Sequence, residues 1–263
     1  MSNILSFNQY IFEGKGDAFD PLINGFYNSI KSTQVEESPR GSNRGPNIEP
    51  LQKGVGVSPG DPWCAAFIYD VLIKSGFSQN IKNQIPKDAA VRFHWANSGG
   101  KKIEYKPNMD INSILPGMAF FYLSKDGKTG GYPGSGHTGI ILSVNNVDKT
   151  WTAVEGNANP LDGSREGYGT FIVTRKLSDP SISKDKKDHP AKLLGFIDYF
   201  SPYRETADFT KNLNDKMKTL VSELLPKTNK EIAYLKANPK VLYDYERNYK
   251  DRNKKPIGGS INR

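Results

Sequence analysis

Residues 60–76 read GDPWCAAFIYDVLIKSG and contain the only cysteine of the chain, Cys64. Asp61 and Pro62 predict the start of a helix, because aspartate caps unpaired N–H groups and proline is favoured at the first helical position. Gly76 predicts the end of this helix. Its apolar residues follow the i, i+3, i+4, i+7, i+8 spacing of one helical face, which must pack on another element: Cys64, Phe67, Ile68, Val71 and Leu72.

The composition of the 263 residues is typical of a globular protein. A single cysteine forms no internal disulfide, so the fold does not depend on an oxidising compartment. No apolar run is long enough to cross a bilayer. Residues 1–17 lack the basic start and apolar stretch of a secretory signal. We therefore expect a protein made in a cytoplasm, with no membrane span.

The net charge of +8 is concentrated near the end of the chain. Residues 201–263 carry 14 Lys and Arg against 8 Asp and Glu, a net charge of +6. A basic surface favours anionic partners such as nucleic acids, teichoic acids, acidic membranes or acidic proteins. A solvated helical face is the common alternative for such a run of charge.

The hydrophobic pattern predicts helices first and strands afterwards. Besides residues 61–76, helical spacing covers residues 21–34, 48–53 and 88–97. After Pro107 short apolar runs predict five strands, at residues 118–123, 138–144, 150–155, 169–175 and 193–200.

This order predicts an α+β fold, with N-terminal helices packed on an antiparallel sheet. Residues 209–225 and 230–249 then predict two further helices. We divide the chain into an N-terminal segment (residues 1–20), an α+β domain (21–200) and a basic helical C-terminal extension (201–263).

Cys64 has two interpretations. A lone cysteine is usually a small buried hydrophobe, whereas a nucleophilic cysteine at a helix start needs a histidine partner. Of the three histidines, His94 falls in a predicted helix, where a structural role is favoured, and His189 falls in a charged loop. His137 follows a glycine-rich loop and opens an apolar strand, so it is the candidate partner.

The hairpin that begins at His137 allows a register to be predicted. If its turn centres near Val147, His137 faces Asn157 across the two strands. Glu155 lies two residues before Asn157, and alternation then places both side chains on the same face as His137. Cross-strand and diagonal neighbours are close enough for polar contact. A slip of one residue would reverse the face.

These residues together suggest nucleophilic catalysis. Cys64, as the third residue of its helix, would have its thiolate favoured by the helix dipole and by a nearby imidazolium. His137 would serve as the base, and Glu155 or Asn157 would orient its ring. The Cys64 N–H would donate to an oxyanion. If Asp61 caps the helix by accepting that same N–H, the two roles conflict.

Four stretches of the sequence resemble the CHAP family, the cysteine, histidine-dependent amidohydrolases/peptidases. GDPWCAAF (residues 60–67) resembles the nucleophile motif of the family. GHTGIILSV (136–144) and VEGNAN (154–159) resemble its histidine strand and its acidic strand. ESPRGSNRGPNIEPL (37–51) is similar to the segment before the cysteine in one bacterial and phage subgroup. The resemblance covers about residues 21–200.

The resemblance implies a papain-like CHAP fold and hydrolysis of amide bonds in peptidoglycan. The bond would be either the one between lactyl group and L-alanine (an N-acetylmuramoyl-L-alanine amidase) or one within the peptide (an endopeptidase). It implies Cys64 as the nucleophile, His137 as the base, Glu155 as the third member and Asn157 as an auxiliary residue. Some relatives bind calcium through an acidic loop, but no such loop is seen near Cys64, so we expect neither a metal nor a cofactor.

Two alternatives remain for the function. The same chemistry could serve a protease or amidase with a substrate outside the wall, or the domain could be a virion or binding component of little activity. Asn43, Arg44 and Trp63 are candidate substrate-binding residues, since arginine suits carboxylate binding. A turn that positions the helix, or a core position for Trp63, is the alternative for these three.

The expected partner is peptidoglycan, met at the cell wall by a protein made in a bacterial cytoplasm, either phage-encoded and carried in a virion or an antibacterial effector. The basic extension could add an anionic wall polymer or phage structural proteins. We expect no nucleic acid as a partner, because neither a recognised module nor an aromatic stacking platform is visible.

Overall fold

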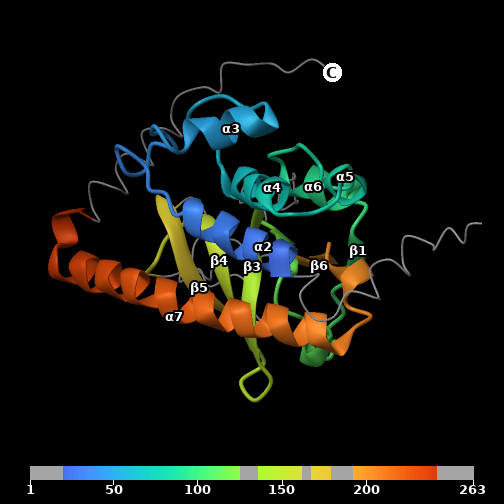
Figure 1. Ribbon diagram of the computed structural model, residues 1–263. Helices are drawn as coiled ribbons and strands as arrows, with labels where there is room; N and C mark the ends of the chain where they lie inside the picture. Colours follow the sequence, from blue (N-terminus) through green and yellow to red (C-terminus); the bar gives the residue numbers. More distant parts are fainter. Residues whose placement is uncertain (1–19, 125–135, 162–166, 179–191, 242–263) are drawn as a thin grey trace, which may run out of the picture.

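The computed structural model describes residues 20–124, 136–161, 167–178 and 192–241. Its centre is a six-stranded antiparallel sheet with the strand order β1-β6-β2-β3-β4-β5 (Figure 1). The α+β class is therefore confirmed. The strands are β1 (Lys101–Glu104), β2 (Ala119–Leu123), β3 (Gly136–Asn145), β4 (Thr150–Ala158), β5 (Gly169–Lys176) and β6 (Lys192–Asp198).

Most helices precede the sheet in the chain, as the periodicity predicts. β1 and the short helix α5 were not predicted, because four residues are too few to show a periodic pattern. The α-helices are α2 (Asp20–Ser32), α3 (Glu49–Val55), α4 (Cys64–Lys74), α5 (Gln79–Lys82), α6 (Val91–Asn97) and α7 (Ala207–Ala237).

The sheet buries both of its faces, and the residues alternate between them along each strand. The helix face packs against α4 and α7, which α2 contacts in turn, and it includes Phe121, Ile140 and Val154. The other face, here called the loop face, packs against the segment that contains Ile111 and Ile114. Its members from the sheet include Phe120, Tyr122, Ile141, Trp151 and Phe196.

Helix α7 is continuous, so the prediction of two helices with a break after residue 225 is wrong. Pro226 lies inside it, although proline removes one helical hydrogen bond and crowds the preceding turn. Apolar burial on both sides of Pro226 stabilises the helix there. The buried face of α7 consists of Phe209, Leu213, Met217, Leu220, Leu224, Thr228 and Leu235.

Polar contacts also attach α7 to the rest of the domain. The Tyr27 hydroxyl donates to Glu223 at 2.6 Å, and the Ile172 N–H donates to the Thr228 hydroxyl at 3.1 Å. In Figure 1 the helix lies along the sheet beside α2. Residues 207–237 thus contribute to the common core, whereas the predicted boundaries at residues 20 and 200 stay predictions. Residues 242–249 of the second predicted helix lie outside the described residues.

The β3–β4 hairpin has the predicted register in its central part and departs from it near the turn. Ile140 pairs with Val154 and Ile141 with Ala153, as expected. Ser143, however, pairs with Thr152 rather than with Trp151, because the register shifts between Ile141 and Ser143. A bulge of this kind inserts one extra residue on one strand. The shift lies on the turn side of these pairs and leaves the predicted face of His137 unchanged.

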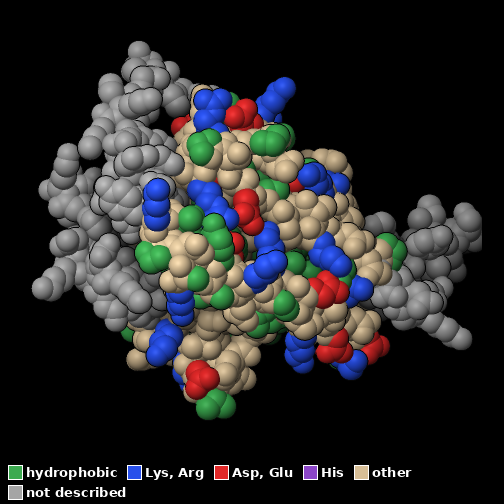
Figure 2. Space-filling view, turned by 90° about the vertical axis from the view of Figure 1, so that its left-hand side faces the viewer, with side chains coloured by type: hydrophobic (Ala, Val, Ile, Leu, Met, Phe, Trp, Pro, Cys, Tyr) green, Lys and Arg blue, Asp and Glu red, His purple; other side chains and the backbone are tan. Residues whose placement is uncertain are grey.

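The face of the molecule drawn in Figure 2 shows dispersed charge. On the face drawn in Figure 2, Lys and Arg side chains are interspersed with acidic ones. Among the described residues, no helix combines the length and the apolar character needed to cross a membrane.

His94 is a structural histidine, as its place in a predicted helix suggested. It lies in α6 with no exposed surface. Its Nδ1 is 3.5 Å from the Asp88 carbonyl oxygen and its Nε2 is 3.4 Å from the Tyr199 hydroxyl. Burial lowers the pKa of His94 from 6.5 to about 4, an effect that the contact with Asp88 only partly opposes. The folded protein therefore holds this ring neutral.

Replacing His94 should reduce the acid sensitivity of folding. Because the folded pKa lies below the unfolded one, the contribution of His94 is complete above pH 6.5 and is lost as the pH falls towards 4. The loss is about 3 kcal/mol. In urea unfolding at pH 7 and at pH 4.5, His94→Gln should lose less free energy of unfolding than wild type between the two pH values. Equal losses would contradict the assignment.

Candidate active site

His137 and Glu155 meet on the loop face of the sheet. His137 is the second residue of β3, Glu155 is the sixth of β4, and neither side chain has exposed surface. The His137 Nε2 lies 2.8 Å from Glu155 Oε2. This contact confirms that the two side chains share a face, as the hairpin register predicts. With Nε2 held by the carboxylate, proton exchange with a thiol falls to Nδ1.

Two glycines make room for this arrangement. A Cβ on Gly139 would lie 2.6 Å from Glu155 Cγ and 2.7 Å from a ring carbon of Phe120. A Cβ on Gly156 would lie 2.6 Å from Phe67 Cβ, on the side where α4 packs. Such distances are too short for carbon–carbon contacts. Gly139 therefore admits the carboxylate on one face, and Gly156 admits helix α4 on the other.

Helix α4 begins later than predicted, which resolves the conflict over Asp61. Cys64 is its first residue rather than its third, and the Trp63 carbonyl accepts the first helical bond, from the Phe67 N–H at 2.9 Å. The Asp61 carboxylate instead accepts the Ser58 N–H at 2.8 Å, and no side chain caps the helix. N–H groups of the first helical turn have no acceptor within the helix. The Asp61 carboxylate is therefore not the acceptor of the Cys64 N–H.

The thiol lies beside the start of β3. Cys64 Sγ is 4.0 Å from the carbonyl oxygen of Gly136, the residue directly before His137. The residue is buried, with only 4% of its surface exposed. Cys64 therefore combines both predicted properties, since it belongs to the apolar stripe of α4 and also lies at the histidine end of the hairpin.

Arg175 is a member of the site that the sequence analysis missed. It lies in β5, has no exposed surface, and donates from Nε to Glu155 Oε1 at 2.7 Å. Burial alone would raise the pKa of Glu155, but Arg175 and the His137 hydrogen bond outweigh it and hold that pKa below its usual value. The available signal was a charged residue, Arg175, at the end of the apolar run predicted as a strand over residues 169–175.

Asn157 does not follow the alternation used to place it. It has a positive φ of 57°, and the pairing of β4 with β5 shifts by one residue between Glu155 and Ala158. The extra residue interrupts the period of two. The Asn157 side chain is nearly fully buried, and its Oδ1 accepts no hydrogen bond in the described structure. An auxiliary role for Asn157 stays a prediction.

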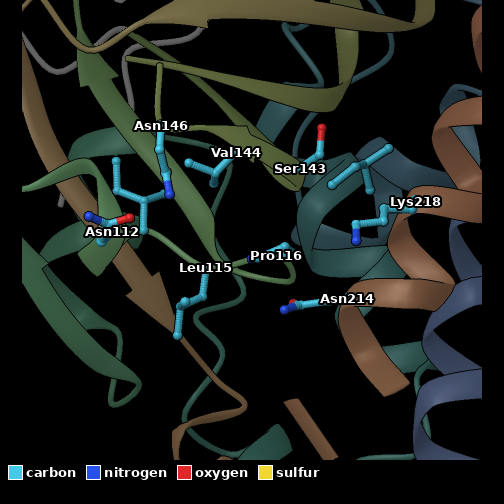
Figure 3. Close-up of a pocket in the computed structure, with 10 residues that line it drawn as sticks. Asn112, Leu115, Pro116, Ser143, Val144, Asn146, Asn214 and Lys218 are labelled. Carbon is cyan, nitrogen blue, oxygen red and sulfur yellow. The ribbon is translucent and has the colours of Figure 1, made fainter. Parts of the chain in front are cut away.

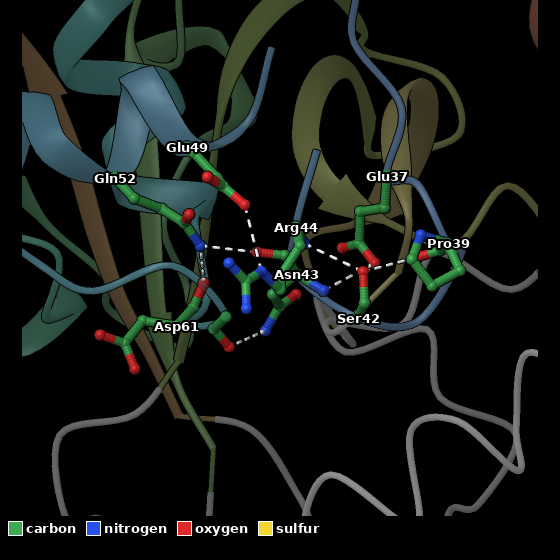
Figure 4. Close-up of polar contacts among 9 residues, drawn as sticks. Glu37, Pro39, Ser42, Asn43, Arg44, Glu49, Gln52 and Asp61 are labelled. Atoms are coloured by element: carbon green, nitrogen blue, oxygen red, sulfur yellow. Dashed lines mark hydrogen bonds and ion pairs between the residues drawn. The ribbon is translucent and has the colours of Figure 1, made fainter. Parts of the chain in front are cut away.

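Two of the three predicted substrate-binding residues have structural roles. Trp63 is fully buried and donates from Nε1 to Glu37 at 3.0 Å, so it does not line a cleft. Asn43 is 1% exposed. Its N–H donates to Glu37 at 2.9 Å, and its side chain donates to the Gly60 carbonyl at 3.2 Å. Arg44 stays exposed and contacts Glu49, and its role stays a prediction (Figure 4).

Glu37 is a second residue that the sequence did not single out, although it begins the segment 37–51 that precedes the cysteine. Its carboxylate binds both the Trp63 ring, which adjoins Cys64, and the loop at Asn43. Gln52 adds a second link, since its side chain donates to the carbonyls of Asn43 and Asp61 (Figure 4). The loop before α4 is thereby attached to the residues that position Cys64.

A pocket of about 200 Å³ lies away from these residues, where α7 meets the turn end of the hairpin (Figure 3). It is lined by residues such as Ser143, Asn146, Asn214 and Lys218, whereas His137 lies at the opposite end of β3. Within the described ranges, no group of three or more His, Cys, Asp or Glu residues could hold a metal ion.

Gly139→Ala should disturb the His137–Glu155 contact. The added methyl would force Glu155 or Phe120 to move, at a cost of about 1–3 kcal/mol. Gly54→Ala is the matched control, since nothing lies within 4 Å of its added Cβ. The control should raise stability by about 0.5–1 kcal/mol. Urea unfolding measures both changes. Equal effects of the two variants would show that Gly139 is not needed for space.

Glu37→Ala should lower stability much more than Glu36→Ala. The first variant leaves two buried donors without their carboxylate acceptor, at about 1–3 kcal/mol each. Glu36 is partly exposed and pairs with Arg40 and Lys227, so its loss should cost about 1 kcal/mol or less. Thermal unfolding compares the two variants. Similar melting temperatures would contradict the role given to Glu37.

Comparisons with known proteins give no match: no family model, no curated protein and no solved structure matches this chain. The roles of Cys64, His137 and Glu155 are accordingly inferred from their positions and contacts.

Proposed function

We propose that this chain is a cysteine amidohydrolase of the CHAP type, with a papain-like fold, that cleaves amide bonds of peptidoglycan. The observation that carries the proposal is the buried contact of 2.8 Å between His137 Nε2 and Glu155 Oε2. Gly136, the residue directly before His137, has its carbonyl oxygen 4.0 Å from Cys64 Sγ. A cysteine at a helix start, a histidine and an orienting carboxylate are the parts that an activated thiol needs.

In the proposed reaction His137 Nδ1 takes the proton of the Cys64 thiol. The thiolate attacks the amide carbonyl carbon, and the Cys64 N–H donates to the oxyanion that forms. The C–N bond then breaks as the imidazolium gives its proton to the leaving amine, which leaves a thioester on Cys64. Water, deprotonated by His137, attacks the thioester and releases a carboxylic acid and the thiol.

Two observations support peptidoglycan as the substrate class. The motifs at residues 60–67, 136–144 and 154–159, which resemble the CHAP family, lie at the start of α4, on β3 and at the end of β4. The net charge of +8 also suits approach to an anionic wall. The bond that is cleaved is either the lactyl–L-alanine amide or an amide within the peptide.

The burial of Cys64 favours a second candidate, a virion or binding component of little activity. Because Cys64 is only 4% exposed, its thiol in the described structure is not open to a large polymer. In this case Cys64, His137 and Glu155 would have a structural role, as part of the packed core.

Cys64→Ala and His137→Ala should each lower the release of fragments from purified sacculi by at least about 10³-fold. His94→Gln is the matched control, because it replaces another buried histidine outside the site and should keep the activity. All variants must show native circular dichroism. Undiminished clearing by a folded Cys64→Ala variant would refute the nucleophile.

Mass spectrometry of the released fragments identifies the bond. Free lactyl groups indicate the amidase, and new peptide amino termini without them indicate the endopeptidase. Intact sacculi combined with cleavage of a protein or peptide conjugate would reject the wall substrate. No cleavage of either substrate by a folded protein would favour the second candidate.

A further inference from the structure

Arg175 binds both oxygens of the Glu155 carboxylate. Its Nε donates to Oε1 at 2.7 Å and its Nη2 donates to Oε2 at 2.5 Å. Oε2 is also the oxygen that contacts His137 Nε2. A two-pronged pair of this kind fixes the plane of a carboxylate as well as its charge. One oxygen of Glu155 therefore joins the guanidinium to the imidazole.

Aromatic rings hold the guanidinium in place. Its carbon lies 5.2 Å from the ring centroids of Phe120 and of Tyr122, both in β2. The His137 ring is 5.8 Å from the Tyr122 ring. Arginine stacks on aromatic faces while its N–H donors, which lie in the guanidinium plane, stay available for hydrogen bonds. Phe120 and Tyr122 therefore border both groups that contact Glu155, the Arg175 guanidinium and the His137 imidazole.

The burial of Arg175 is costly unless its charge is matched. Neither Arg175 nor Glu155 has exposed surface. Burial alone would lower the pKa of Arg175, but Glu155 raises it above its usual value, so the guanidinium stays charged. Removing one partner of a buried pair leaves an uncompensated charge and is strongly unfavourable.

We propose that Arg175 is a positioning residue for Cys64 and His137: it holds Glu155 as an oriented anion, so that the thiolate–imidazolium pair forms near neutral pH. This inference rests on the proposed function, because it assigns a role within the same site.

The reason is a balance of charge. With Arg175 present, Arg175 and Glu155 cancel, and moving a proton from Cys64 to His137 leaves the net charge of the site at zero. Without Arg175, Glu155 leaves the buried site with one negative charge, which is unfavourable. The site would then take up an extra proton, giving an imidazolium beside a thiol. The thiolate would form only when that proton is lost, at a higher pH.

The test measures the alkylation of Cys64 by iodoacetamide from pH 5 to pH 9, followed by mass spectrometry of the intact protein. Arg175→Met should move the midpoint of the rate profile up by about one pH unit, which is about a tenfold lower rate at pH 6. Arg175→Lys keeps the positive charge but loses the bidentate geometry of the guanidinium. It should therefore move the midpoint by no more than half as much as Arg175→Met does.

Arg204→Met is the matched control. Arg204 also forms a largely buried pair, with Asp198 at 2.7 Å, but it binds the Pro116 carbonyl and lies outside the site. The Arg204→Met variant should lower the melting temperature and leave the midpoint of the alkylation-rate profile unchanged from wild type. A shift common to both variants would indicate general loosening and would overturn the inference.

Nitrogen-15 NMR of the His137 ring gives a second measurement that simple destabilisation does not move. In wild type the neutral ring should carry its proton on Nε2, and Arg175→Met should raise the pKa of the ring. If Arg175→Met does not fold, Arg175→Lys is compared with wild type by both methods.

Each outcome separates the two proposals. An unchanged midpoint and an unchanged His137 titration in folded Arg175 variants would overturn the role of Arg175 and leave the proposed function intact. A wild-type Cys64 that resists alkylation over the whole pH range would count against the proposed function. The His137 titration would then still decide what Arg175 does.

Discussion

A carboxylate without exposed surface, Glu155, is the constraint that shapes the centre of this protein. An anion at such a position must be matched by cations or by hydrogen-bond donors. Arg175 supplies two donors from β5, and His137 supplies a third from β3. The Glu155 side chain thereby links the neighbouring strands β3, β4 and β5. The orientation of the His137 ring, and with it the nitrogen available to a thiol, depends on this junction.

Close packing around the junction explains the small residues in its motifs. Gly139 leaves the space that the Glu155 side chain fills, and Gly156 lets α4 approach β4 from the opposite face. Cys64 then lies where the first turn of α4 meets the start of β3. The loop before α4 is held from behind by Glu37, through Trp63 and Asn43. Apolar packing and polar positioning thus act on the same short helix.

Much of this arrangement could be predicted from local patterns. The apolar stripe of α4 is buried as its spacing indicates, and the five predicted strands are present. The shared face of His137 and Glu155 followed from counting across one hairpin, since alternation along a strand is strict between bulges. Asn157 shows the limit of this method, because a single extra residue in β4 ends the alternation just before it. The continuity of α7 through Pro226 was not predicted, because this helix is stabilised by contacts with residues far away in the sequence, such as Tyr27 and Ile172.

The sequence by itself determined the α+β class, the existence of the helix that contains Cys64 and the hairpin that places His137 and Glu155 on one face. These features depend on residue spacing within short segments, where periodicity is a direct consequence of backbone geometry. Only the tertiary structure decided that Arg175 and Glu37 belong to the site, that Trp63 and Asn43 are buried, and that Asp61 contacts Ser58 rather than Cys64. Each of these depends on which side chains the packed core excludes from water. A buried arginine or glutamate needs a partner of opposite charge or a hydrogen-bond partner, and the local sequence pattern does not predict which charged residues are buried.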